Sequence, residues 1–209
     1  MKKIYCFAIC FVASVASLFA SAEGKFTLTG YVDTYYTSDN LDKEYQDFTS
    51  INHEREKFSL NIAYLLFKYS DSSYRAKIGL QEGDIAKSSW FEEPQNIEQA
   101  NIGIRLTKGL WLDGGIFTTH IGGEWTHPRM NYFSSHSSVT FFQPAYQAGV
   151  KLSYELNEHW SADFHIINGN HLFGDNNSQK TLAYSLSYES DFISAFYAGM
   201  TGNEAVSYT

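Results

Sequence analysis

Three histidines and one glutamate share a long polar segment, residues 120–144, and raise the question of a metal site. His120, His127 and His136 lie in this segment, with Glu124 between the first two. Imidazole and carboxylate groups suit zinc or copper. However, the intervals of seven and nine residues between the histidines match no compact ligand motif. We therefore predict no metal site and interpret these histidines as surface residues of a loop.

Serines beside one of these histidines suggest a membrane phospholipase as an alternative. Such an enzyme needs a serine nucleophile, a histidine base and a supporting polar group that converge near the lipid interface. Ser134, Ser135 and Ser137 flank His136, but no nucleophile-elbow pattern surrounds them. We therefore predict that the protein is not an enzyme and needs no cofactor.

Charged and polar side chains recur at every second position of several otherwise apolar segments. If one face of these segments bounds a water-filled lumen, mixed charges there set a field that tunes solute selectivity. Alternatively, they only keep the lumen wet and pair with each other. Arg75 and Lys77 share a segment and a face, so they form the best small basic patch. The predicted lumen-lining residues are Asp33, Arg75, Lys77, Asn101, Arg105, Asp113, Lys151, Glu155, Asp163 and His165.

The segments that carry these residues have the period-two alternation of β-strands. In residues 149–166, apolar and polar residues alternate on both sides of Asn157-Glu158, which is typical of an antiparallel hairpin. No segment indicates a clear amphipathic helix. We count about nine strand-like segments: 25–36, 57–69, 74–81, 97–107, 110–119, 145–156, 160–169, 181–189 and one that begins at residue 192.

The connections between these segments alternate in length along the chain. All long loops should therefore emerge at one end of the strands and all short turns at the other. Outer-membrane barrels are built in this way, whereas a soluble Greek-key sandwich has no reason to sort its loops. The long connections are 37–56, 82–96, 120–144 and 170–180, and the short ones are 70–73, 108–109, 157–159 and 190–191.

Segment length and aromatic residues also favour lipid over a soluble barrel. The segments have roughly 8–13 residues, close to the roughly 9–11 that cross a bilayer at a tilt. Aromatic residues such as Tyr74, Trp111 and Trp160 gather near the short turns, as in a membrane-interface girdle. A secreted lipocalin-like barrel with an apolar cavity is the alternative. We predict an all-β fold, an antiparallel transmembrane up-and-down β-barrel.

The N-terminus has the features of a secretory signal peptide. Lys2 and Lys3 precede an apolar run, and Ala20-Ser21-Ala22 is a small-x-small cleavage pattern. We therefore predict a signal peptide over residues 1–22 and a barrel domain over residues 23–209. Cys10 raises a lipoprotein signal as an alternative, but Ile9 does not provide the small residue that such a site needs.

Composition limits the class of partner. The formal net charge is -8, and an acidic balance argues against nucleic acid. Aromatic residues make up 17% of the chain, and tyrosine and phenylalanine favour strands. Mean hydropathy is -0.30, which excludes a helical membrane protein. The barrel that we predict needs only alternate residues to be apolar, and its partner is the lipid of a Gram-negative outer membrane.

Five stretches resemble the OmpL-like β-barrel porin family of Gram-negative outer membranes. They are residues 30–36, 98–100, 110–122, 131–134 and 168–169. The resemblance covers most of the chain after the signal peptide. It implies an outer-membrane barrel of the porin kind, with no catalytic residues.

Members of this family look longer than the present chain. Bacterial single-chain barrels have an even number of strands, and about nine are counted here. Residues 202–209 resemble the start of another long loop. We therefore expect the domain to be the N-terminal part of a larger barrel, incomplete at its C-terminus.

The sequence favours an outer-membrane channel for passive diffusion of small hydrophilic solutes. The alternative is a barrel without an open pore whose surface loops act as an adhesin or receptor, or which is structural. Residues 120–144 bear on this choice, because an aromatic-rich loop could fold inward and constrict the lumen or lie outside as a lid. The sequence leaves both open, together with a homo-oligomeric state.

Overall fold

The computed structural model describes residues 24–38, 51–90, 94–174 and 179–202, together with residues 40, 44, 45, 49 and 92. The predicted signal peptide and residues 203–209 lie outside the described residues. Among the described residues, no helix has both the length and the apolar character needed to cross a membrane.

Nine strands form one antiparallel sheet in which each strand pairs with the next along the chain. This up-and-down order confirms the predicted all-β class, and β1 and β9 are the two edges of the sheet. The strands are β1 (Lys25–Tyr36), β2 (Phe58–Ser70), β3 (Tyr74–Glu82), β4 (Ile97–Thr107), β5 (Leu110–Thr118), β6 (Tyr146–Glu155), β7 (Trp160–Ile167), β8 (Thr181–Glu189) and β9 (Ser194–Thr201).

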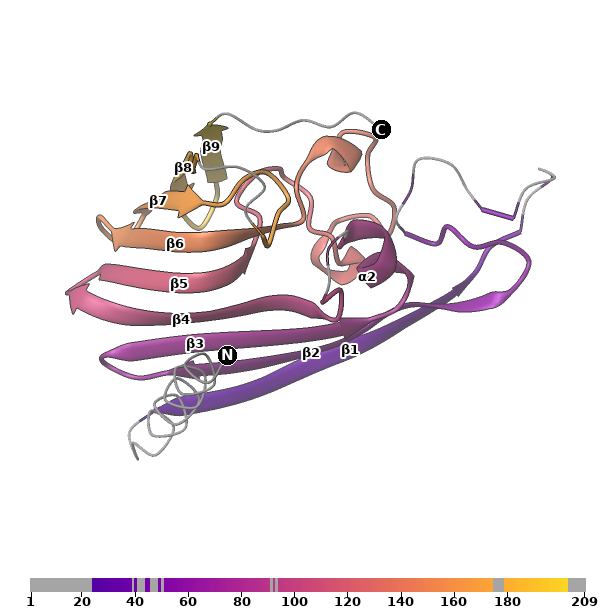
Figure 1. Ribbon diagram of the computed structural model, residues 1–209, viewed down its shortest axis with the longest axis horizontal. Coiled ribbons are helices and arrows are strands. Elements are labelled where there is room, and N and C mark those ends of the chain that lie inside the picture. The colour runs from indigo at the N-terminus through magenta and orange to yellow at the C-terminus, as the bar shows by residue number, and fades with distance from the viewer. Residues whose placement is uncertain are drawn as a thin grey trace, which may run out of the picture.

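The two faces of the sheet differ in chemistry because successive side chains of a strand point to opposite faces. The sheet is curved, and α2 (Asp84–Ser89) lies on its concave side (Figure 1). On β3, Leu80 is 38% exposed while the neighbouring Gln81 is only 3% exposed. The convex face carries exposed apolar side chains on every strand, among them Phe26, Leu28, Val32, Leu65, Ile78, Ile104, Leu112, Val150, Phe164, Leu182, Leu186 and Tyr197.

Local hydrogen bonds close the short connections 70–73, 157–159 and 190–191 at one end of the sheet. The Asp71 carboxylate accepts hydrogen bonds from the backbone N–H groups of Ser73 and Tyr74, at 2.7 and 2.6 Å. Asn157 Oδ1 does the same for the N–H of Trp160, at 3.0 Å. Such side-chain-to-backbone bonds are what favours aspartate and asparagine in turns. The bounds of the strands confirm the predicted alternation of long and short connections.

Two local expectations were wrong. The segment 82–96 contains α2, which a sequence reading misses because six residues are too few to show a helical period. Its stability comes from tertiary packing, since Ile85 is fully buried in a cluster with Ile51 and Ile62. Trp111 does not belong to a lipid-facing girdle. It is 6% exposed and lies on the concave face beside Arg75.

Candidate functional site

Seven of the ten predicted lumen-lining residues meet in one hollow of about 260 Å³ on the concave face. The five neighbouring strands β3 to β7 contribute to it, because the polar side chains of each strand point to the same face of the sheet. We call these seven residues the polar wall: Arg75 and Lys77 of β3, Asn101 of β4, Asp113 of β5, Lys151 and Glu155 of β6, and Asp163 of β7.

A bidentate ion pair occupies the centre of the polar wall. Arg75 Nε donates to Asp113 Oδ1 at 2.7 Å, and a second guanidinium N–H donates to Asp113 Oδ2. The Asp113 side chain is 3% exposed and that of Arg75 is 28% exposed. Two parallel N–H···O bonds fix the geometry as well as the charge of such a pair. Arg75 and Asp113 therefore neutralise each other.

A glycine on the strand between them makes this pair possible. Gly103 on β4 is the register partner of both Arg75 on β3 and Asp113 on β5. A Cβ at position 103 would lie 2.2 Å from Asp113 Oδ1, closer than atoms can approach. The arginine therefore reaches across β4 only because that position carries no side chain.

The predicted residue Arg105 lies beside the polar wall rather than in it. Its guanidinium carbon is 4.9 Å from the centre of the Trp111 ring, and that of Arg75 is 4.6 Å from the same ring. Both distances are within the range of cation–π attraction. Trp111 thus holds both arginines against the sheet.

The lysines are held differently from the arginines. Lys151 Nζ lies 5.0 Å from the centre of the Phe117 ring. Lys77 is the direct register partner of Lys68 on β2, so both side chains share the concave face. Within the described part of the chain, none of these three lysines forms an ion pair.

The remaining two predicted residues lie outside the hollow. Asp33 accepts a hydrogen bond from Asn61 Nδ2 at 2.7 Å, toward the long-loop end of β1. His165 is 3% exposed, and its ring is stacked on that of His120, with 4.4 Å between ring centres. His120 Nδ1 is in turn 2.8 Å from Gln147 Oε1.

The structure corrects the interpretation of His127 as a surface residue. The side chain is 6% exposed, because the loop between β5 and β6 folds back over the concave face. Its Nε2 is 3.4 Å from Glu98 Oε1 on β4, and its ring centre is 4.5 Å from that of Tyr64 on β2. The loop, whose position the sequence left open, therefore contacts the inside of the sheet.

Glu98 was not predicted because a β-bulge changes its direction. It has the same parity as Ala100 and Ile102, which belong to the apolar set of β4. The β3–β4 register shifts between Gly79 and Leu80, and Glu98 becomes the unpaired residue. Its carboxylate turns inward, where Tyr64 OH donates to it at 2.5 Å. Gly79 leaves the space, since a Cβ there would lie 2.5 Å from Glu98 Oε2.

Two further loops pack beside the loop that carries His127. Trp90, which follows α2, is fully buried and stacks on Tyr146, with 5.6 Å between ring centres. The ring centre of Phe173, from the connection between β7 and β8, lies 4.1 Å from that of Tyr146. In the same connection, His171 Nε2 is 2.7 Å from the Ser89 carbonyl oxygen. We call the docked segments 83–90, 119–145 and 168–174 the loop cap.

Burial affects the titration of histidines in the loop cap. It lowers the pKa of His127, and the attraction of the Glu98 carboxylate only partly opposes this. Burial also lowers the pKa of His136 and His171, and their contacts to the Trp125 and Ser89 carbonyls only partly oppose this. The neutral form of each ring is therefore the one that fits the docked loops.

The three histidines of the loop do not converge on a metal. His120, His127 and His136 contact Gln147, Glu98 and the Trp125 carbonyl respectively. Glu124 accepts hydrogen bonds from the hydroxyl groups of Thr140 and Ser137, which lower its pKa. No group of three or more potential metal-ligating side chains is found in the part of the chain that the structure describes.

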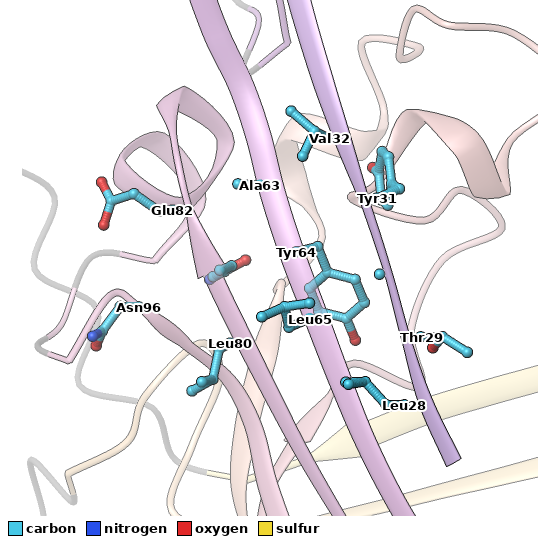
Figure 2. A pocket seen from close by; sticks show the side chains of 12 residues that line it. Leu28, Thr29, Tyr31, Val32, Ala63, Tyr64, Leu65, Leu80, Glu82 and Asn96 are labelled. Carbon is cyan, nitrogen blue, oxygen red and sulfur yellow. The ribbon is translucent and has the colours of Figure 1, made fainter.

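A larger hollow, of about 740 Å³, lies along β1, β2 and β3. Figure 2 shows its lining, with Leu28, Leu65 and Leu80 coming from three adjacent strands. These three side chains are 38–53% exposed, and Val32 is 68% exposed. Its exposed side chains are thus those of the apolar convex face, not of the polar wall.

A comparison with known families supports the resemblance found in the sequence. A family model described as "Putative beta-barrel porin-2, OmpL-like" matches residues 25–209. The match includes all nine strands and every residue of the polar wall. No curated protein and no solved structure matches the chain.

Proposed function

Because the chain belongs to the OmpL-like β-barrel porin-2 family, we propose that it is part of an outer-membrane channel for passive diffusion of small hydrophilic solutes. The observation that carries this proposal is the separation of the two faces. The concave face gathers ionised side chains around a hollow, while the convex face exposes aliphatic and aromatic side chains. A wall that is polar inside and apolar outside suits water on one side and lipid on the other.

This separation argues against the soluble alternative. A lipocalin-like barrel encloses an apolar cavity and presents polar side chains to the solvent. Here Val32, Ile78 and Phe164 lie on the convex face, each more than 40% exposed. In water these side chains would form a large exposed apolar surface, whereas in a bilayer they meet acyl chains.

The proposal requires the sheet edges to be covered. The outer edges of β1 and β9 carry backbone N–H and C=O groups without a strand partner among the described residues. In lipid such groups cost several kcal/mol each, so only a closed barrel is tolerated. We therefore propose that further strands pair with β1 and β9 and close the barrel. Residues 25–201 then form one section of its wall.

The loop cap belongs to the proposed channel as a constriction at its long-loop end. Its contacts lie on the concave side, from Tyr35 OH to Asp84 at 2.7 Å through to His127 on Glu98. Hydrogen bonds and packing of buried aromatic rings hold the cap against the sheet. A channel narrowed in this way passes small solutes and excludes large ones.

One observation favours the second candidate, a barrel that binds a ligand outside the cell and has no open pore. The loop between β5 and β6 exposes large apolar side chains, notably Tyr132, Phe133 and Phe142, each at least 76% exposed. Exposed aromatic residues are enriched at binding surfaces. A catalytic role receives no support, since a porin-type family is generally non-enzymatic.

Planar-bilayer recording of the full-length protein tests the proposal. We expect stepwise, ohmic conductance after insertion, because the polar wall carries water. Insertion without conductance would exclude the channel and favour the ligand-binding barrel. Assay of the same preparation for lipid hydrolysis, with heat-denatured protein as a control, tests the phospholipase alternative.

A further inference from the structure

The cations of the concave face fall into two groups. Arg75 is neutralised by Asp113, and the guanidinium carbon of Arg105 lies 4.9 Å from the centre of the Trp111 ring. Lys68, Lys77 and Lys151 form no ion pair within the described residues. Because no ion pair in the described part of the chain neutralises the lysines and Arg105 lies outside the hollow, the lysines supply the uncompensated positive charge at this height of the wall.

The arrangement of two of these lysines is unfavourable without an anion. Lys68 and Lys77 face each other directly across β2 and β3, and like charges placed opposite each other destabilise a sheet. Lys151 lies in the same hollow as Lys77 and carries the same charge, so it adds to the repulsion. A wall that only needed to stay wet would gain from a carboxylate at one of these positions.

The two carboxylates of the polar wall that are not paired with arginine, Glu155 and Asp163, lie farther toward the short turns than Lys151. Glu155 is four residues beyond Lys151 on β6, about 13 Å along the strand. Asp163 pairs in register with Ser153, two residues beyond Lys151. A solute in the hollow therefore meets a basic belt and an acidic belt at different heights.

We propose that Lys68, Lys77 and Lys151 form a binding site for the carboxylate or phosphate group of a small anionic solute inside the channel. This deepens the proposed channel function and rests on it. Lysine suits the task because its ammonium group is a mobile, well-hydrated point charge. It binds an anion strongly enough to concentrate it and weakly enough to release it, as conduction requires.

The full-length protein in a planar bilayer, with a potassium chloride gradient across the membrane, provides the test. We expect the reversal potential to show a preference for chloride over potassium. Each of Lys77→Gln and Lys151→Gln should lower the permeability ratio about threefold, the effect of one charge at roughly 7 Å in water. Lys77→Arg should preserve the ratio, and Lys108→Gln, in a short turn, is the matched control.

Block of the chloride current distinguishes the two anion classes. Inorganic phosphate and succinate, added separately at millimolar concentration, should reduce the current of the wild type. Both anions should reduce the current of the double variant Lys77→Gln/Lys151→Gln less than that of the wild type. The anion that blocks the wild type more strongly shows whether phosphate or carboxylate is preferred. Retention of the heat-modifiable mobility of folded barrels in gels confirms that each variant is folded.

Two outcomes overturn the inference in distinguishable ways. Conductance with no anion preference, or with a preference that both lysine variants leave unchanged, removes the binding site and leaves the channel. Absence of conductance from wild type that has inserted removes the channel and the binding site together.

Discussion

The polar wall and the loop cap lie on the same face of the sheet but are built in opposite ways. In the polar wall, neighbouring strands hold charged side chains in register, and the Arg75–Asp113 pair crosses a glycine on the strand between. In the loop cap, segments distant in sequence dock through buried rings such as Trp90 on Tyr146. The wall is therefore part of the sheet, whereas we predict that the cap can detach without unfolding it.

The largest effect should come from replacing the most buried aromatic side chain of the loop cap. Trp90→Ala removes a fully buried side chain, and such changes cost about 3–5 kcal/mol. We expect this cost to weaken the docking of the cap on the sheet and not the folding of the sheet. Conductance should therefore rise, while the urea concentration at the midpoint of barrel unfolding stays unchanged. Trp125→Ala, at a side chain that is 52% exposed, serves as the control. A large fall of the urea midpoint would refute the independence of cap and sheet.

The corresponding change in the wall should act on the sheet itself. Asp113→Ala leaves Arg75 without its partner, and breaking a buried pair in this way costs about 3–5 kcal/mol. Since Arg75 is 28% exposed, we expect about 3 kcal/mol, measured by urea unfolding in lipid vesicles. The double variant Arg75→Gln/Asp113→Ala should recover much of the loss. Equal losses in single and double variants would show that the pair is not coupled.

A smaller loss is expected from the glycine beneath the pair. Gly103→Ala introduces a Cβ that would meet Asp113 Oδ1 at 2.2 Å, so the carboxylate must move. Overpacking of this kind costs about 1–3 kcal/mol. Gly114→Ala is the matched control on β5, because the nearest atom to its Cβ would be 3.9 Å away. Equal stability of the two variants would contradict the crossing geometry.

The smallest effect should be a dependence of the cap on pH. Burial lowers the pKa of His127, so the docked state favours the neutral ring. Docking is thus at full strength above the ordinary pKa of about 6.5 and weakens as the pH falls below it. We expect conductance to rise between pH 7.5 and pH 5, and less so in His127→Gln. A decrease of conductance on acidification would mean that the cap binds more tightly when protonated.

The sheet could be predicted from the sequence because the patterns that specify it lie within single strands and the connections between them. Alternation along each strand and the sorting of short and long connections fixed the class, the strand order and the polar parity. Seven of the ten predicted residues meet in the hollow because strand parity alone decides their direction.

The loop cap could not be predicted because its contacts join segments distant in sequence. His127 lies 29 residues from Glu98, and nothing near either residue indicates the pairing. Glu98 itself points inward only because of the bulge opposite Gly79. Trp111 was misplaced because proximity to a short turn does not say which face a side chain takes.

The most direct test of the central claim, that the concave face is the water-filled one, compares two adjacent residues of β3. Residues 23–209 contain no cysteine, so Lys77→Cys and Ile78→Cys each introduce a single thiol into the predicted barrel domain; Cys6 and Cys10 lie in the predicted signal peptide. In lipid vesicles, a charged thiol reagent that cannot cross the membrane should modify position 77 rapidly and reduce conductance, and should leave position 78 unmodified. Equal modification of both positions, or faster modification of position 78, would contradict the account.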